Sequence, residues 1–325
     1  MDVDVILPVF KGTRWVHETI ESVLTQTYPK WHLTVIDDAS PDDTVACIRP
    51  FCQSYPDRIS LIQLAENRGA PGARMAAIGK TKGDVIAFID QDDRWRTEKL
   101  ETQIRRLNRK PRVQAVHSDV IHINQNGNII NRSADRENHI RSAGTGDILS
   151  AKKRMAKFIL NNPVRLGTSV ILREAFIDIG GFNETLFGGE DWEFWIRFAS
   201  KWRIGHIAEP LVERRIHERN VSAFFKDSRI NGAFSALDII ENRYPHLRPF
   251  IPLRRAQLLR RAAVESLEND RKVEAGKYAR DLFPLKPMQA SALLFLCLPF
   301  MTRHKPILRF VRRLRSSFFG GFLRR

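Results

Sequence analysis

Residues 83–95, GDVIAFIDQDDRW, carry the pattern that decides the fold: a short apolar run that ends in a cluster of acids. A run of roughly four to eight apolar residues bounded by turn residues is typical of a buried strand, so residues 84–90 are predicted to form one. Similar runs occur elsewhere in the first part of the chain, at residues 3–9, 31–37, 59–64 and 113–118.

Segments with helical spacing of apolar residues separate these predicted strands. The predicted helices begin at Thr13, Ser40, Pro71 and Thr97. At the second of them, Ser40 has the position of an N-cap, Pro41 lies in the first turn and Asp43 closes a capping box. Strands that alternate with helices about every 25 residues are typical of a parallel α/β sheet with right-handed crossovers. Such sheets bind their ligands at the carboxyl ends of the strands.

The pattern becomes mixed after residue 118. The Asn126–Gly127 pair predicts the turn of a β-hairpin. Apolar spacing predicts helices near residues 151–160 and 189–201, short strands near 168–173 and 211–217, and a helical, basic segment from residue 229 onward.

The composition indicates a globular protein. The chain has 325 residues, enough for about two domains, and 43% of them are hydrophobic and 28% charged. There is no apolar run of ~18 residues, so no ordinary membrane-spanning helix is expected. The three cysteines lack the spacing of a zinc site, and acids stand at Asp2 and Asp4, where a secretory signal would carry lysines. These features predict a protein of the reducing cytoplasm.

The positive charge is concentrated near the C-terminal end of the sequence. The net charge is +16, of which residues 221–325 contribute +13, from 21 Lys and Arg against 8 Asp and Glu. The rest of the chain is nearly balanced. Basic segments of this kind bind polyanions such as nucleic acid or anionic lipid.

The acid cluster of residues 90–93 is the first candidate site. In an extended chain, positions i and i+2 face the same way, so Asp90 and Asp92 are expected to reach the same point while Asp93 faces away. Carboxylate oxygens suit Mg²⁺ or Mn²⁺, which complete their coordination with water and substrate phosphates. The alternative is a polar strand end followed by a turn.

Other polar groups also lie at predicted element ends. Asp37 and Asp38 end a predicted strand, where a carboxylate could accept hydrogen bonds from a ribose or a base, or simply begin a turn. Residues 67–74, NRGAPGAR, open a helix with two glycines and two arginines, which suits either a phosphate site or a plain turn.

Residues 188–195, GGEDWEFW, predict a helix whose apolar face anchors it in the core and whose first turn carries Glu190 and Asp191. A helix start favours the ionised form that a general base must have, although acids are also common there as ordinary caps. His217 follows a short predicted strand, and a single histidine is more often structural than a ligand.

The motifs occur in a recognisable order, and together they resemble the family-2 glycosyltransferases with the GT-A fold, of the bacterial, non-processive type. The resemblance spans roughly residues 3–222. It rests on ILPVF, SVLTQTYP, VIDDASPDDT, ENRGAPGAR, GDVIAFIDQDDRW, GGFNETLFGGEDWEFWIRFA and RIHERNVS.

The resemblance implies a Rossmann-like mixed sheet flanked by helices, with a C-terminal helical extension. It implies that residues 1–110 form the nucleotide-sugar-binding half and residues 111–222 the acceptor-binding half with the catalytic base. Residues 223–325 then form the basic helical region, which could associate with a membrane.

Roles for individual residues also follow from the resemblance. Asp191 matches the catalytic base and Glu190 stands beside it. The resemblance further implies donor binding by Pro8, Phe10, Asp38, Arg74, Asp90, Gln91 and Arg215, and metal binding by Asp92, Asp90 and His217.

The implied activity is that of an inverting, metal-dependent glycosyltransferase of the hexosyltransferase type. With Mn²⁺ or Mg²⁺, it would move one sugar from a nucleotide-diphospho-sugar, a UDP-sugar being favoured, to a hydroxyl of a glycan or a lipid-linked acceptor. Cell-surface polysaccharide synthesis is the expected setting. Lys11, Met75 and Gln91 depart from the family pattern, which leaves the donor's identity open.

The basic C-terminal segment predicts a membrane contact. Residues 290–301 are apolar but too short to span a bilayer, and residues 307–318 have the spacing of a basic amphipathic helix. The expected location is therefore the inner face of the cell membrane. The alternative is that the helix packs on its own domain. No nucleic-acid partner is expected. A catalytically inactive polyanion-binding or membrane-binding protein, or less readily a sugar nucleotidyltransferase, are the alternative functions.

Overall fold

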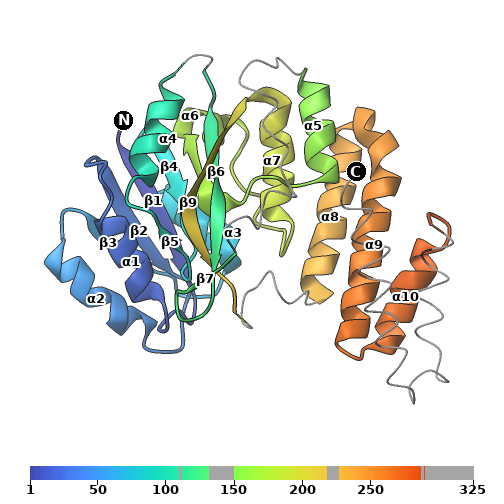
Figure 1. Ribbon diagram of the computed structural model, residues 1–325, viewed down its shortest axis with the longest axis horizontal. Coiled ribbons are helices and arrows are strands. Elements are labelled where there is room, and N and C mark those ends of the chain that lie inside the picture. Colours follow the sequence, from blue (N-terminus) through green and yellow to red (C-terminus); the bar gives the residue numbers. More distant parts are fainter. Residues whose placement is uncertain (110–111, 132–149, 218–226, 287–288, 290–325) are drawn as a thin grey trace. The chain divides into compact units, whose positions relative to one another are not determined.

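The computed structural model describes residues 1–109, 112–131, 150–217, 227–286 and 289 (Figure 1). The chain divides into two compact units, Met1–Phe224 and Phe225–Arg325. Each unit is described separately.

The first unit is built on a mixed sheet. The strand order is β3-β2-β1-β4-β8-β6-β9-β5, with β7 paired to β6 outside this path. The strands are β1 (Val3–Val9), β2 (Trp31–Asp37), β3 (Ile59–Gln63), β4 (Val85–Phe88), β5 (Arg94–Trp95), β6 (Ala115–Ile123), β7 (Ile129–Asn131), β8 (Ser169–Leu172) and β9 (Ile204–Arg215).

The directions of the strands determine where polar side chains can gather. Strands β1 to β4 are parallel, as predicted. The expectation of a wholly parallel sheet is wrong beyond β4, because β8 inserts antiparallel between β4 and β6. Since β9 runs parallel to β6, the carboxyl ends of β1, β2, β4, β6 and β9 still share one edge of the sheet. The mixed sheet implied by the resemblance is confirmed.

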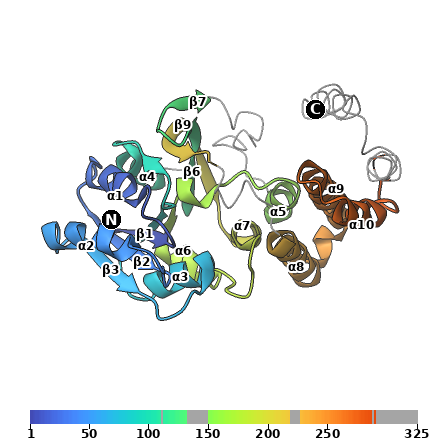
Figure 2. The ribbon, with the colours of Figure 1, turned by 90° about the horizontal axis from the view of Figure 1, so that it is seen from below.

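Helices cover both faces of this sheet: α1 and α4 lie on one side, and α3 and α6 on the other (Figure 2). The helices of this unit are α1 (Val16–Leu24), α2 (Thr44–Ser54), α3 (Gly69–Ile78), α4 (Lys99–Leu107), α5 (Ala151–Leu160), α6 (Arg173–Asp178) and α7 (Glu190–Lys201), with a short 3-10 turn η1 (Leu166–Thr168). The strand near residue 211 begins earlier than predicted, and α6 was not expected.

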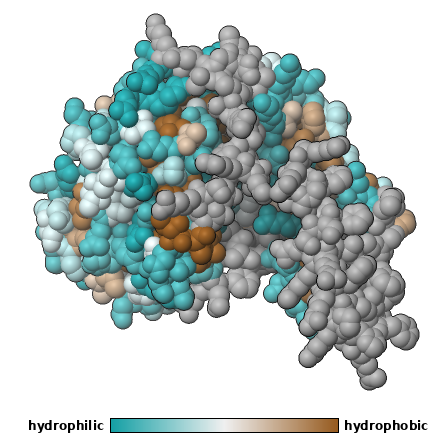
Figure 3. All heavy atoms as spheres, viewed as in Figure 1, coloured by the Kyte–Doolittle hydropathy of each residue, from teal (hydrophilic) through white to brown (hydrophobic). Residues whose placement is uncertain are grey.

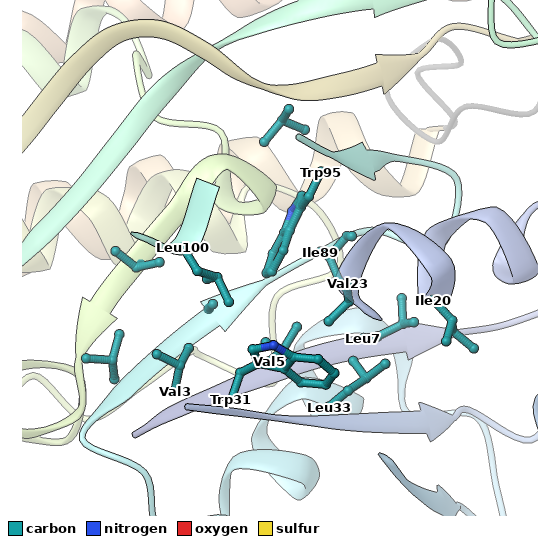
Figure 4. Close-up of a cluster of buried hydrophobic side chains, with 14 of the residues drawn as sticks. Val3, Val5, Leu7, Ile20, Val23, Trp31, Leu33, Ile89, Trp95 and Leu100 are labelled. Atoms are coloured by element: carbon teal, nitrogen blue, oxygen red, sulfur yellow. The ribbon is translucent and has the colours of Figure 1, made fainter. Parts of the chain in front are cut away.

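The alternation of side chains along the strands builds the core. Val5 and Leu7 of β1 and Leu33 of β2 lie in one buried cluster with Ile20 of α1 and Leu100 of α4 (Figure 4). All are completely buried, and burying one such side chain stabilises the fold by about 1.5–3 kcal/mol. This packing fixes the strand ends that carry the candidate site residues.

All four predicted helix starts in the first part of the chain are shifted. The third helix begins at Gly69 rather than Pro71 and the fourth at Lys99 rather than Thr97, and the first two differ by more. The first helix begins at Val16 rather than Thr13. The predicted capping box is wrong: α2 begins at Thr44, its N-cap Asp43 makes no side-chain cap bond, and Asp42 accepts the Thr44 amide instead. Ser40 has a different partner, because its hydroxyl accepts a hydrogen bond from the backbone of Lys11 on a neighbouring segment.

The second unit is helical, as predicted. It contains α8 (Asp227–Arg243), the 3-10 turn η2 (Pro245–Phe250), α9 (Ile251–Glu268) and α10 (Lys272–Leu282). Its core is formed by Leu259 and Ala263 of α9 with Ala279 and Leu282 of α10. The predicted amphipathic segment at 307–318 and the apolar run at 290–301 lie outside the described residues.

Within the described part of the chain, no helix is both long enough and apolar enough to cross a membrane. On the face drawn in Figure 3, the described surface is mostly hydrophilic, and apolar side chains occur in small patches.

Candidate active site

The acid cluster lies at the end of β4, where it forms a tight turn. The amide of Asp93 donates to the carbonyl of Asp90 (3.1 Å), so residues 90–93 are not extended and the i, i+2 argument does not apply. Asp92 nevertheless reaches His217, which follows β9: the carboxylate and the imidazole Nε2 are 2.8 Å apart. Asp93 turns inward and accepts a hydrogen bond from the Arg215 amide (2.9 Å).

Negative charge is crowded in this turn. Burial, and then the charge of Asp90, raise the pKa of Asp92, while the bond to His217 acts in the opposite direction. Burial and both neighbouring carboxylates hold the pKa of Asp93 well above its usual range. A cation would relieve this repulsion, and carboxylate with imidazole is a donor set that suits Mn²⁺ or Mg²⁺. The residues therefore fit a divalent ion, although the described residues form no group of three or more His, Cys, Asp or Glu arranged to hold one.

Arg74 of α3 connects the acidic turn to the start of α7. Its guanidinium lies 3.0 Å from the Asp90 carboxylate and 3.9 Å from that of Glu190, and the side chain is 8% exposed. The Arg74 Nε is buried and has no hydrogen-bond partner among the described residues. The Arg74 guanidinium thus contacts both the acidic turn and the start of α7, two candidate sites that are 100 residues apart in the sequence.

Asp191, at the start of α7, has the raised pKa that suits a general base. Burial, and next the charge of Glu190, raise its pKa to about 6, against a smaller opposing effect of Arg74. Burial and the Glu190 charge therefore outweigh the preference of a helix start for the ionised form of Asp191. Gly188 and Gly189 precede α7 with φ of 99° and 77°, a conformation that glycine adopts without strain. They turn the chain so that Glu190 and Asp191 begin the helix beside Arg74.

The tip of β1 lies against the acidic turn. Phe10 is 38% exposed, and its backbone amide and carbonyl both bond to the side-chain amide of Gln91, at 2.8 and 3.1 Å. Pro8 is half-buried within β1, paired in register with Ile36 of β2. The structure therefore brings Phe10 and Gln91 together with Asp90 and Asp92.

Asp38 joins the end of β2 to the glycine-rich turn. It is 4% exposed, and its carboxylate accepts the Arg68 amide at 2.7 Å. Its carbonyl accepts a hydrogen bond from the Asn67 side chain at 3.0 Å. Asp38 thus holds the segment that leads into α3 and Arg74.

Arg215 is a fully buried member of the site. Its guanidinium donates to the carbonyls of Asp92 (3.0 Å) and Gln125 (3.0 Å) and to the carboxylate of Glu18 (2.7 Å). These bonds fasten the acidic turn to the hairpin between β6 and β7. These bonds allow Arg215 to position the acidic turn, and its role in donor binding stays a prediction.

Sequence reasoning missed several residues that complete the site. The Trp15 ring packs on the His217 ring, with centroids 4.2 Å apart, and Glu18 bridges Arg215 and Arg94. Trp15 is the N-cap residue of α1 and Glu18 lies in its first turn, but no local signal pairs them with residues 200 positions away. Phe187 is 59% exposed, four residues before Asp191, and Gly69 of α3 leaves room for its ring.

Comparison with known proteins shows which family the chain resembles. The family model described as Glycosyl transferase family 2 matches residues 4–180. The Escherichia coli protein WfgD, a UDP-Glc:alpha-D-GlcNAc-diphosphoundecaprenol beta-1,3-glucosyltransferase, is 41% identical over 102 residues, which are 31% of this chain and 39% of that protein. The chain spans about a third to two fifths of the length of the first curated relatives that it matches.

Two solved structures share the fold. S. aureus TarS 1-349 in complex with UDP-GlcNAc superposes with a TM-score of 0.62 at 17% identity, covering 90% of this chain and 84% of that one. The mannosyltransferase PcManGT from Pyrobaculum calidifontis, in complex with GDP-Man and Mn²⁺, gives a TM-score of 0.59 at 20% identity, covering 91% and 85%.

Proposed function

Because the chain belongs to glycosyltransferase family 2, we propose that it moves one sugar, with inversion, from a nucleotide-diphospho-sugar to a hydroxyl of a glycan or lipid-linked acceptor. The observation that carries the proposal is the bridge made by Arg74. It places the strand-end acids that suit a metal–diphosphate group next to a carboxylate whose pKa of about 6 suits a base.

Asp92 and His217, with Asp90 beside them, would hold the Mn²⁺ or Mg²⁺ ion. When bound, the ion would act as a Lewis acid and offset the charge that grows on the departing nucleoside diphosphate. The related fold of PcManGT was solved with Mn²⁺, which supports a divalent ion for this chain. Trp15 and Arg215 hold His217 and the acidic turn in place for this task.

Asp191 would be the general base. It takes the proton of the acceptor hydroxyl as the oxygen forms a bond to the anomeric carbon, while the bond from that carbon to the diphosphate oxygen breaks on the opposite face. A carboxylate with a pKa of about 6 is largely ionised at pH 7 and still basic enough to accept the proton. Glu190 raises the basicity of Asp191, and Arg74 limits that effect.

The donor would lie across the tips of β1 and β2. Phe10 and Pro8 would flank the nucleoside, Asp38 and Gln91 would hold the surrounding backbone, and Arg74 would face the phosphates. A UDP-sugar is favoured because the WfgD name specifies UDP-Glc and the TarS complex contains UDP-GlcNAc. The exposed Phe187 ring, which lies against Gly69 at the start of α3, would be available to the acceptor.

The test of this function is a donor screen. The full chain is exposed to a panel of UDP-, GDP- and dTDP-sugars with and without Mn²⁺, and the thermal shift and slow donor hydrolysis are measured. A Mn²⁺-dependent response to one donor class supports the proposal. Polyanion binding without any response to a nucleotide-sugar would instead indicate an inactive binding protein, and formation of a nucleotide-sugar from a nucleoside triphosphate would indicate a nucleotidyltransferase.

The basic C-terminal segment would hold the enzyme on the inner face of the cell membrane, close to a lipid-linked acceptor of cell-surface polysaccharide synthesis. The eight Lys and Arg from Arg303 onward would each contribute about 1 kcal/mol near an anionic surface. The WfgD name, which contains diphosphoundecaprenol, supports a lipid-linked acceptor. Flotation with anionic liposomes should be strong for the full chain and weak for a chain that ends at residue 285; equal flotation would contradict this location.

A further inference from the structure

The tip of β1 is held in a strained conformation. Lys11 has a φ of 53°, which is uncommon for a residue with a side chain. Such a conformation is unfavourable for a residue with a side chain and persists only where the surroundings impose it. It follows Phe10 directly, so the position of the exposed Phe10 ring depends on it.

Side chains from separate segments impose this conformation. The amides of Phe10, Lys11 and Gly12 donate, in that order, to Gln91 (2.8 Å), Ser40 (3.1 Å) and Thr44 (2.9 Å). Ser40 and Thr44 flank the start of α2, whereas Gln91 belongs to the acidic turn. Only the first of these three bonds therefore connects the tip to the candidate metal site.

Gln91 holds Phe10 by two bonds rather than one. Its Oε1 accepts the Phe10 amide, and its Nε2 donates to the Phe10 carbonyl, as a neighbouring strand would. A Cβ at Gly12 would lie 2.7 Å from Gln91 Oε1, so any larger residue there would require the Gln91 amide to move from its place against Phe10. The backbone of Gln91 is fixed as well, because its carbonyl accepts the Thr19 hydroxyl of α1 at 2.9 Å.

Gln91 stands between Asp90 and Asp92 in the turn where carboxylates repel one another. A divalent cation at Asp92 would remove this repulsion and hold the turn in one shape. Because the Gln91 side chain extends from that turn to Phe10, the same ion would fix the tip of β1. Coupling of this kind is reciprocal, so a nucleoside on Phe10 would also strengthen cation binding.

We propose that Gln91 is a positioning residue that couples divalent-cation binding at the acidic turn to nucleoside binding at Phe10. This inference rests on the proposed function, since it takes Asp92 as a metal ligand and Phe10 as the nucleoside contact.

Uridine is the probe that isolates this coupling. It has no phosphate to ligate the ion, so an effect of Mn²⁺ on uridine affinity must pass through the protein. Calorimetric titration of the full chain with uridine should give an affinity that rises about fivefold or more when Mn²⁺ is added. In Gln91→Met, which keeps the side-chain length without the amide, uridine affinity should no longer depend on Mn²⁺.

Ser40→Ala is the matched control. It removes the bond to Lys11 on the same tip, so uridine affinity should fall, but by the same factor with and without Mn²⁺. A purely structural role of Gln91 would give this pattern in Gln91→Met too, and would overturn the proposal. Where Gln91→Met does not fold, Gln91→Asn replaces it, because the shorter side chain cannot make both bonds to Phe10.

Titration with UDP separates the two levels of the inference. If wild-type uridine affinity does not respond to Mn²⁺ while UDP binding does, the coupling is wrong and the proposed function stands. If neither UDP nor uridine binds under any condition, both are wrong.

Discussion

The two sides of the acidic turn each contain a buried arginine, and the two arginines are used differently. On the side of β9, the guanidinium of Arg215 is completely buried and bonded to two backbone carbonyls and the Glu18 carboxylate within 3.0 Å. On the side of α3 and α7, Arg74 makes one close contact, with Asp90, and a second at 3.9 Å, with Glu190, and its Nε has no partner among the described residues.

The difference between the two arginines suggests different tasks for the two sides of the acidic turn. A buried cation with all its bonds made is complete without a ligand, and it keeps the surrounding backbone in one arrangement. A buried cation with an unused donor and one long contact can still gain bonds when an anionic substrate arrives. Under the proposed function, the β9 side would position the candidate metal ligands, and the α3–α7 side would carry the groups that respond to substrate.

Replacing the candidate base tests the α3–α7 side most strongly. Asp191→Asn should lower turnover by about 10²–10⁴-fold, because the amide cannot accept the acceptor's proton. Donor binding should persist. Initial-rate assays and donor titration measure these effects, and Asp57→Asn, at an exposed acid, is the control. Wild-type turnover in Asp191→Asn would place the chemistry elsewhere.

The same variant should be more stable than wild type at neutral pH. The folded protein holds the Asp191 proton up to a pH of about 6, whereas the unfolded chain releases it near 3.8, so stability falls as pH rises through that window. Asn removes this loss, and the free energy of unfolding at pH 7.5 should rise by roughly 1–3 kcal/mol, with no gain below pH 3.8. Urea denaturation at both pH values checks the sign.

The two arginines should differ in their contribution to stability. Arg215→Met should lower the free energy of unfolding by about 3 kcal/mol or more, since it leaves buried carbonyls and a carboxylate without their partner. Arg74→Met should lower it by about 1–2 kcal/mol, because Asp90 is half-exposed and can be solvated. Equal losses in urea denaturation would remove the distinction between the two sides.

Replacing Asp92, the candidate metal ligand, tests the acidic turn that lies between the two sides. Asp92→Ala should weaken Mn²⁺-dependent donor affinity at least tenfold, with a smaller effect on affinity measured without the ion. Titration of the donor with and without Mn²⁺ measures both. An unchanged Mn²⁺ dependence would exclude Asp92 as a ligand.

The smallest expected effect is on the pH dependence of the reaction. The acid limb of kcat/KM should have an apparent pKa of about 6, below which activity falls as Asp191 gains its proton. Arg74 lowers the pKa of Asp191, so Arg74→Met should move this limb to higher pH. An unchanged apparent pKa of the acid limb in Arg74→Met would show that the titrating group is not beside Arg74.

The predicted strands at residues 3–9, 31–37 and 59–64 and the predicted helix near 189–201 were found within one residue of their expected ends, because their apolar periodicity is local and the core uses it directly. The capping box at Ser40 was not found, since a better partner, the Lys11 amide, comes from another strand end. The alternation of strands and helices in the sequence did not predict the antiparallel β8, because the pairing of a strand depends on contacts with distant segments.

The sequence by itself determined which strand ends carry acids, and that Glu190 and Asp191 begin a helix with an apolar face. Only the tertiary structure decided that Asp90–Asp93 is a turn, that Arg215 is completely bonded while Arg74 is not, and that Gln91 holds Phe10. The reason is physical: periodicity and chain ends act within a few residues, whereas the charge, burial and bonding of these groups depend on segments between 16 and 197 positions away.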